Sequence, residues 1–413
     1  MRYELFISLR YLKAKRKQIF ISLITFLSMA GVGLGVMALV VVLSVMRGFE
    51  DDLKNKILGT NAHLVIQQHG GPIRDYSEVI QKVKGTNGVV AVTPFIFTPS
   101  MITSENNVSG IVLRGIDPAT AGGVINIEKT LKKGSLDTLK EKDDPSVQPG
   151  ILIGKELAQN LGVILNDTVV VVSPTGALAA VGMGGMGPPM KKFRVSGIFD
   201  TGMYEYDTSL AYISLRSAQK FLGMDDTVLG VEVKVEDIYD VREVARRIQR
   251  ELGFPFWTKD WMQMNRSLFA ALKLERTVMF IILVLIVLVA AFGIVSTLIM
   301  VVMEKNKDIA ILKSMGATAR SVMRIFILEG LIVGVVGTIL GLIGGYAICR
   351  ILAEYQFISL PRDVYYISHL PVKMSEMDFF LIALAAMGIS FLATLYPSWQ
   401  ASKLDPAEAL RYE

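Results

Sequence analysis

Four long apolar segments constrain this chain more than any other feature of its sequence. A helix that crosses a bilayer needs about 20 predominantly apolar residues. Segments 19–46, 277–303, 325–352 and 377–397 reach this length, and the first two contain no charged residue. The sequence therefore predicts an integral membrane protein with four transmembrane α-helices.

The composition adds a soluble part to these spans. Of the 413 residues, 52% are apolar and 20% are charged, and the mean hydropathy is +0.46. These values fit a few spans joined to one or two soluble domains. The net charge of +5 comes with basic residues bunched beside the apolar segments. That distribution is typical of topology signals and does not indicate nucleic-acid binding.

The distribution of Lys and Arg predicts the orientation of the spans. Segments 1–18 and 304–324 are rich in basic residues, whereas 353–376 holds only two. The positive-inside rule then places 1–18, 304–324 and the tail 398–413 in the cytoplasm, so both termini are cytoplasmic. Segments 47–276 and 353–376 lie outside. The first apolar run is far longer than that of a signal peptide, and we interpret it as an uncleaved anchor.

The external segment 47–276 alternates short strand patterns with helical ones, which indicates a large α+β domain between the first and second spans. A domain of this size can hold two lobes, one from 50–112 and 226–265 and the other from the inserted segment 113–225. The strand-like runs are His63–Gln67, Val89–Phe97, Gly110–Gly115, Thr168–Val172, Lys192–Ile198 and Leu229–Val235. The helical runs are Ser77–Lys84, Lys155–Leu161, Leu215–Leu222 and Val241–Leu252.

One stretch of the external domain, 173–190, has an unusual composition. It contains no charge, five glycines, three prolines and three methionines, and strand-like runs flank it. Long loops in compact domains are usually functional or disordered, and exposed methionines suit an adaptable apolar surface. A functional loop and a flexible hairpin tip are equally compatible with this pattern.

The third span carries small residues at four-residue spacing. Gly330 and Gly334 form one series and Gly337, Gly341 and Gly345 a second, and this spacing lets helix backbones approach closely in lipid. Packing within one subunit is the simpler interpretation, and a contact between subunits is the alternative. The acidic Glu329 lies one turn inside this span, where its side chain is expected to reach the interface. A proton relay at Glu329 is the less favoured interpretation.

The connection 304–324 reads as a short helix, a break and a new helix. Ile309, Leu312 and Met315 repeat at helical spacing. Gly316 suits the position after the helix end, and Thr318 can cap the next helix. An amphipathic helix joined to two spans would be a good lever for a partner protein. The alternative is a helix that lies on lipid headgroups.

The sequence contains none of the common catalytic patterns. It has no G-x-x-x-x-G-K-[ST] loop for ATP and no G-x-S-x-G nucleophile motif, and its three histidines are isolated. We therefore expect no enzyme activity, no metal site and no cofactor of its own, with ATP bound by a partner subunit.

Three stretches together resemble the type VII ABC permeases and, among them, the lipoprotein-releasing (LolC/LolE) branch. They run from Gly33 to Glu50, from Val302 to Gly316 and from Thr394 to Glu413, and the match covers the whole chain. The first stretch and the glycine-rich loop point to the lipoprotein branch. Arg47 stands where the family pattern leads us to expect a small polar residue.

The resemblance implies extraction of lipoproteins from a bacterial inner membrane and their transfer to a periplasmic carrier. It implies two copies of a LolD-like ATPase, a second permease that is a copy or a LolE-like paralogue, and a LolA-like carrier. The carrier is expected on the loop residues Pro188, Pro189, Met190, Lys191 and Lys192. The ATPase is expected to bury Ile309, Leu312 and Met315, with Gly316 ending the helix and Glu304 and Asp308 facing basic groups.

The resemblance also places lipoprotein acyl chains, beside membrane lipids, at the outer end of the spans. We expect them against Val42, Met46 and Phe49 of the first span and Thr277 and Ile281 of the second. Val42 and Met46 share one helix face. Met46 packing simply between helices is the alternative.

Two related functions compete with lipoprotein release. A MacB-type efflux permease resembles this chain with an ATPase domain fused in front, whereas only 18 residues precede the first span here. An FtsX-like signal transducer, which activates a periplasmic hydrolase, usually carries a smaller external domain.

Overall fold

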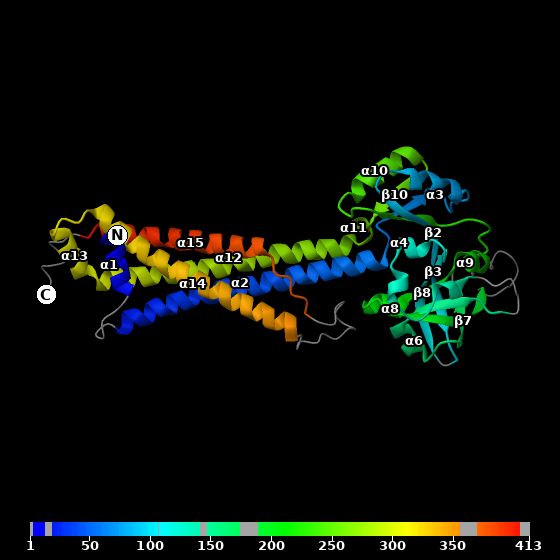
Figure 1. Ribbon diagram of the computed structural model, residues 1–413, viewed down its shortest axis with the longest axis horizontal. Helices are drawn as coiled ribbons and strands as arrows, with labels where there is room; N and C mark the ends of the chain where they lie inside the picture. The colour runs from blue at the N-terminus through cyan, green and yellow to red at the C-terminus, as the bar shows by residue number, and fades with distance from the viewer. Residues whose placement is uncertain are drawn as a thin grey trace. The chain divides into compact units, whose positions relative to one another are not determined.

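The computed structural model describes residues 3–12, 19–105, 107–140, 147–173, 189–355 and 370–404 (Figure 1). The chain divides into two compact units. The helical unit comprises Met1–Glu50, Ala271–Ile358 and Leu370–Glu413. The α+β domain is built from Asp51–Ala270.

Four of the described helices are long and apolar enough to cross a membrane. They are α2 (Ile19–Thr60), α12 (Arg266–Glu304), α14 (Ala319–Tyr355) and α15 (Glu376–Ser402). Each predicted span lies inside one of these helices, but the helices are longer than the spans. Charged residues such as Arg47 and Glu50 end the apolar run of α2 without ending the helix, because Leu53 and Ile57 continue a buried face one turn apart.

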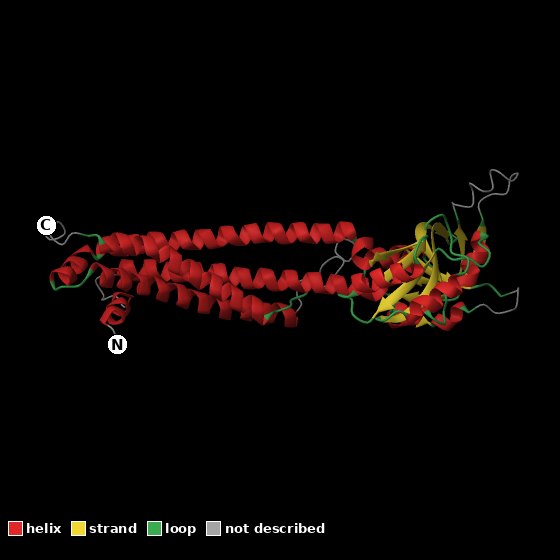
Figure 2. Ribbon diagram, turned by 90° about the horizontal axis from the view of Figure 1, so that it is seen from above, coloured by secondary structure: helices red, strands yellow, loops and turns green. Residues whose placement is uncertain are grey.

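Helix α14 is the most buried of the four. Half of its most apolar stretch is buried within the chain, against 6% for α12. Figure 1 shows α14 beside α15, Figure 2 shows the same long helices from above, and the glycines of α14 explain how closely α14 and α15 pack. A Cβ at Gly337 would lie 2.8 Å from that of Val32 on α2, and one at Gly334 would lie 2.5 Å from Ser390 on α15. Packing within one subunit is therefore confirmed for these glycines.

Glu329 does not reach the interface as the sequence suggested. Its side chain on α14 is 2% exposed and lines a small cavity with Ser28 and Thr297, whose hydroxyl groups are hydrogen-bonded to each other. Its Oε2 atom has no hydrogen-bond partner among the described residues. The prediction was wrong because depth along a span does not say which side of the helix faces the bundle.

One end of the helical unit is closed by short helices. Helix α1 (Tyr3–Leu12) packs on α14 through Tyr11 and Phe326, whose ring centroids are 6.4 Å apart. Helix α13 (Asn306–Ser314) lies at the same end (Figure 1). A small apolar core unites α12, α13, α14 and α15 there, formed by Val301, Val302, Ile309, Val322, Phe326 and Ala401.

Among its described residues, the α+β domain has one mixed sheet of ten strands, with the order β10-β1-β9-β2-β3-β8-β5-β7-β4 and β6 paired with β2 and β7. The β3–β8 and β5–β7 pairs are parallel, and the other pairs are antiparallel. The strands are β1 (Leu64–Gln68), β2 (Val89–Thr103), β3 (Val108–Ile116), β4 (Leu131–Gly134), β5 (Gly150–Gly154), β6 (Thr168–Val172), β7 (Met190–Phe199), β8 (Leu210–Ser214), β9 (Gly230–Val235) and β10 (Phe256–Asp260).

Short helices flank this sheet, and α3 and α10 pack together near β10 (Figure 1). The predicted α+β pattern is confirmed within the described residues. The segment 113–225, predicted as an inserted lobe, adds strands to the sheet that the flanking segments also build. The helices are α3 (Tyr76–Gly85), α4 (Ala121–Val124), α5 (Ile127–Thr130), η1 (Leu136–Leu139), α6 (Lys155–Leu161), α8 (Tyr204–Ser209), α9 (Leu215–Leu222), α10 (Val241–Leu252) and α11 (Trp261–Met264).

Candidate functional site

A pocket of about 320 Å³ opens in the helical unit between α2, α12 and α15. We call it the helix pocket. Its apolar side chains come from α2 and α12, and charged side chains stand beside them. The lining residues are Leu43, Met46, Arg47, Glu50, Arg276, Met279, Phe280 and Asp378. This combination suits an amphipathic ligand with an apolar body and a polar end.

Two ion pairs connect the three helices at this pocket. Arg47 on α2 contacts Asp378 on α15 at 2.7 Å. Arg276 on α12 donates from both Nε and Nη2 to the carboxylate of Glu50 on α2. The side chains of Arg47 and Arg276 are 41% and 74% exposed, so these ion pairs contribute little to stability. They do determine the positions of the charged groups at the pocket.

Of the five residues predicted to bind acyl chains, Met46 lines the helix pocket. Val42, Phe49, Thr277 and Ile281 are not among its lining residues. The pocket uses positions one residue away, such as Leu43 on α2 and Phe280 on α12. A shift of one residue turns the helix face by about 100°. The rotation of two uniformly apolar helices about their axes cannot be predicted from their sequences.

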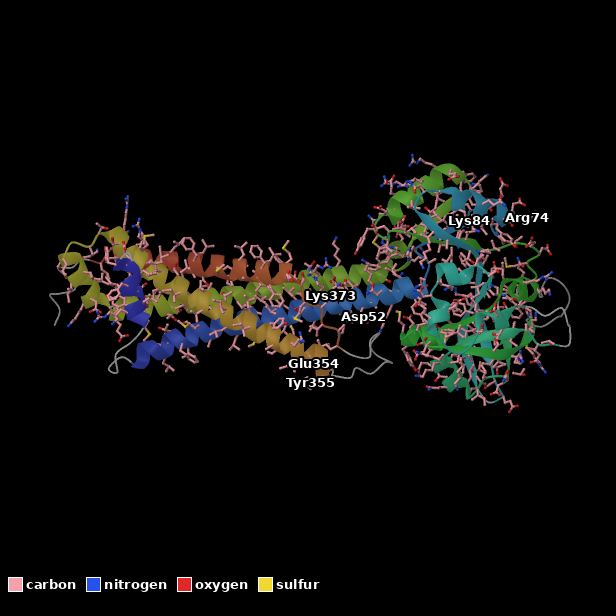
Figure 3. The ribbon with its side chains drawn as sticks, in the orientation of Figure 1. Asp52, Arg74, Lys84, Glu354, Tyr355 and Lys373 are labelled. Carbon is pink, nitrogen blue, oxygen red and sulfur yellow. The ribbon has the colours of Figure 1, made fainter. Side chains whose placement is uncertain are left out.

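A short connection before α15 packs against α2 beside the helix pocket. The backbone N–H of Lys373 donates to the carbonyl of Ser44 at 2.9 Å, and Figure 3 marks Lys373 in this connection. At Gly48, an added Cβ would collide with the carbonyl of Pro371. Gly48 is therefore required by close backbone approach rather than by its backbone angles.

The predicted coupling helix is present as α13, but its faces are not as predicted. Ile309 is 1% exposed and packs in the small apolar core of the helical unit, so it cannot be buried in a partner as predicted. Met315 is 80% exposed, and Ile311, which was not predicted, is 49% exposed. Leu312 is half-buried. The apolar spacing of α13 therefore places Ile309 in the core of the chain itself, and not on a surface for a partner.

The charged positions near α13 are accessible. Glu304 ends α12 and is exposed, and Asp308 lies 3.4 Å from the buried Lys305. The end of α13 is built as predicted. Gly316 has a φ of +97°, its N–H donates to Lys313, and the N–H of Ala317 donates to Leu312, which is a Schellman motif. Thr318 accepts from the N–H of Ser321 at 3.2 Å and caps α14.

The glycine-rich stretch connects two paired strands, β6 and β7, whose last described pair is Val172 and Met190. Pro188 lies outside the described residues, and Pro189 accepts a hydrogen bond from the N–H of Ser173. Met190 is 66% exposed at the start of β7. Lys191 and Lys192 belong to β7 itself, so these three residues have the fixed backbone of a strand rather than that of a loop.

A larger cavity of about 600 Å³, which was not predicted from the sequence, lies in the α+β domain. We call it the sheet cavity. The last turns of α2, the start of α12 and the strands β1, β2, β3, β9 and β10 contribute to its walls. Its base holds an ion pair between Arg114 on β3 and Glu232 on β9, both more than 90% buried. Arg114 and Glu232 each interrupt an apolar run in their strand. A strand with one face in solvent shows the same interruption, so the sequence does not reveal that the two charges are buried and paired.

The electrostatics of the buried pair follow from its surroundings. Burial raises the pKa of Glu232 above its ordinary value, and the Arg114 guanidinium opposes that rise. Burial also raises the pKa of Tyr212, whose ring lies 5.5 Å from the Arg114 guanidinium carbon. Across the described residues, no three His, Cys, Asp or Glu side chains gather in a way that could hold a metal ion.

Two family models match this architecture. The FtsX-like permease C-terminal model matches residues 280–406, which span α13, α14, α15 and most of α12. The MacB-like periplasmic core domain model matches residues 25–251. These matches define the class: a bacterial multi-pass membrane permease with a MacB-like domain.

Full-length relatives narrow the class to a family. The lipoprotein-releasing system transmembrane protein LolC of Xylella fastidiosa (strain Temecula1) is 38% identical over 98% of both chains. The LolE and LolC proteins of Haemophilus influenzae are each 28% identical, over 99% of both chains. The chain belongs to the LolC/LolE family of lipoprotein-releasing system transmembrane proteins.

Proposed function

We propose that this chain is the permease subunit of an ABC transporter that extracts outer-membrane-directed lipoproteins from the inner membrane. The observation that carries this proposal is the similarity to lipoprotein-releasing proteins from end to end, at 38% identity. A match restricted to the helices or to the α+β domain would support only a general permease.

In this proposal the chain crosses the bacterial inner membrane four times, with both termini in the cytoplasm. The density of Lys and Arg in 1–18 and 304–324 supports this orientation. The α+β domain is then periplasmic. The helix pocket belongs to the periplasmic ends of α2, α12 and α15, where acyl chains from the outer leaflet would enter.

The helix pocket suits a lipid-anchored protein in two respects. Leu43, Met46, Met279 and Phe280 offer apolar surface, and methionine adapts to acyl chains of varied shape. The ion pairs of Arg47 and Arg276 stand where the polar end of such a ligand would lie. A pocket of 320 Å³ is at the small end for a ligand of this size, so a second permease, as a copy or a LolE-like paralogue, supplies the other wall.

The energy comes from a separate LolD-like ATPase in two copies, which binds the ATP. Met315 and Ile311 form the exposed apolar surface of the 304–316 region, and Glu304 and Asp308 stand near it. This surface docks on the ATPase, and the Schellman turn at Gly316 transmits its displacement to α14. Ile309 has no part in the docking surface, because it is buried within the chain.

The β6–β7 connection receives the LolA-like periplasmic carrier. Exposed Met190 at the base of this connection provides apolar surface on a fixed strand. A strand-anchored contact loses less conformational entropy on binding than one made by a free loop, which supports a docking role.

Copurification tests this assignment against its two rivals. The tagged chain, extracted in mild detergent, should bring down an ATPase, lipoproteins and a small periplasmic carrier. A membrane-fusion protein in place of the carrier would indicate a MacB-type efflux permease. A cell-wall hydrolase would indicate an FtsX-like signal transducer, and either result would overturn the proposal.

A further inference from the structure

The sheet cavity is larger than the helix pocket, and neither the helix pocket nor the docking surfaces use it. Its volume of about 600 Å³ lies within the range of ligand-binding sites. Phe97 on β2 lines it and is 44% exposed, and Phe95 stacks beside Phe97 with ring centroids 6.2 Å apart. An aromatic side chain left this exposed inside a cavity offers contact area to a ligand.

The charges around the sheet cavity balance. Arg114 and Lys259 bring two positive charges, and Glu205 and Glu232 bring two negative charges. Such a balance disfavours phosphate and other strongly anionic groups, which would need an excess of positive charge. The remaining polar lining consists of amide and hydroxyl groups that both donate and accept hydrogen bonds: Asn61, Gln67, Tyr206, Ser209, Asn265 and Ser267.

Glu232 indicates that a ligand of this cavity would supply a hydrogen-bond donor. Its Oε1 pairs with Arg114, while its Oε2 is buried and has no hydrogen-bond partner among the described residues. A buried acceptor without a donor is costly, so a ligand that brings an N–H group there gains a charge-assisted hydrogen bond. An acyl chain brings no donor, whereas a peptide backbone brings one at almost every residue.

We propose that the sheet cavity binds a short extended peptide, namely the segment of the lipoprotein that adjoins its lipid-modified end. Main-chain N–H groups reach Glu232, and side chains pack on Phe97 and Phe95. This inference rests on the proposed function, because it requires a lipid-anchored substrate. Met46 of the helix pocket and Leu53 of the sheet cavity are seven residues apart in the sequence.

Photocrosslinking tests this inference in the full chain with its partner subunits, purified without ATP or carrier. A photoreactive residue replaces Phe97 in one preparation and Met101 in a matched control. Met101 lies on the same face of β2, is 47% exposed and does not line the cavity. We expect about tenfold more lipoprotein adduct at position 97, which corresponds to a difference of 1.4 kcal/mol in local occupancy. Mass spectrometry should place the adduct beside the lipidated end.

A double substitution, Arg114→Met with Glu232→Leu, supplies the second test. Replacing a buried ion pair by apolar residues of similar size usually preserves the fold. The peptide then loses its acceptor, so we expect the adduct at position 97 to fall about tenfold, while an adduct at position 46 remains. Because position 46 reports on the acyl chains, it separates this inference from the proposed function.

Three results would overturn the inference. They are equal yields at positions 97 and 101, adducts that map to the folded body of the lipoprotein, or an unchanged yield in the double variant. If position 46 still traps lipoprotein in these cases, the proposed function stands and only the sheet-cavity assignment falls. If position 46 traps none, both fail.

Discussion

Helices α14 and α12 have similar lengths and are both strongly apolar, yet they differ in how much of their surface is buried within the chain. The glycines of α14 admit α2 and α15 to close contact, and half of its most apolar stretch is buried. Helix α12 has a single glycine, Gly293, and a Cβ there would meet nothing within 4 Å. Only 6% of its most apolar stretch is buried. Hydropathy alone therefore marks a span, whereas small residues mark which span the chain packs internally.

This difference indicates that α14 and α12 have different structural roles. Helix α14 forms the internal support of the helical unit. Helix α12 leaves large apolar side chains such as Phe280, Val289 and Phe292 exposed, at 65%, 69% and 63%. In the proposed function this exposed helix supplies one wall of the substrate path.

The largest expected effect distinguishes a buried from an exposed apolar side chain on the connection between α12 and α14. Ile309→Asp would put a charge into the small apolar core and should lower the free energy of unfolding by more than about 3 kcal/mol. Met315→Asp changes an exposed side chain and should alter stability by less than about 0.5 kcal/mol. It should nevertheless uncouple ATP hydrolysis from lipoprotein release.

Denaturant unfolding in detergent and a release assay with the assembled transporter measure these two outcomes. Normal release by Met315→Asp would mean that this surface contacts only lipid headgroups. Normal stability of Ile309→Asp would mean that α13 is not fixed against the chain's own core.

A second pair of variants tests the glycines themselves. At Gly337→Leu, the new Cβ would lie 2.8 Å from Val32 Cβ, so overpacking should cost about 2–3 kcal/mol. Gly293→Leu meets open space and gains helix propensity, so stability should stay equal or rise by up to about 1 kcal/mol. Thermal unfolding of both variants in the same detergent decides the point. Equal losses at the two positions would remove the distinction between the helices.

The smallest effect concerns the charged contact of α12 with α2. Arg276→Ala breaks the pair with Glu50, but the Arg side chain is 74% exposed, so we expect a loss of about 0.5 kcal/mol. Arg47→Ala is the matched variant for the pair between α2 and α15. A loss above about 2 kcal/mol for Arg276→Ala would show that polar contacts, rather than packing, hold α12 in place.

Periodic and local signals in the sequence predicted much of the structure. Apolar length located the four helices, strand and helix patterns located most of the α+β elements, and Gly316 and Thr318 located a helix end and a cap. These features depend on residues near one another in the chain. Backbone geometry and hydrogen bonding determine them without reference to the rest of the fold.

The sequence did not predict which side of each helix or strand faces the interior of the fold. Ile309 and Glu329 are both buried, although one was predicted for a partner and the other for the interface. The pairs Arg47–Asp378 and Arg114–Glu232 join positions more than one hundred residues apart. A uniformly apolar helix carries no signal for its rotation, and of the five residues predicted to bind acyl chains only Met46 lines the helix pocket.

Photocrosslinking at Met46 tests the central claim most directly. A photoreactive residue at this position, in the transporter assembled without ATP, should trap a lipoprotein through its acyl chains, and ATP should reduce the adduct. The control is Leu27, which lies on the same helix and is 59% exposed, but is placed nearer the cytoplasmic leaflet by the proposed orientation. We predict no adduct at Leu27. Equal yields at the two positions, or a yield at Met46 that ATP does not change, would contradict lipoprotein extraction through the helix pocket.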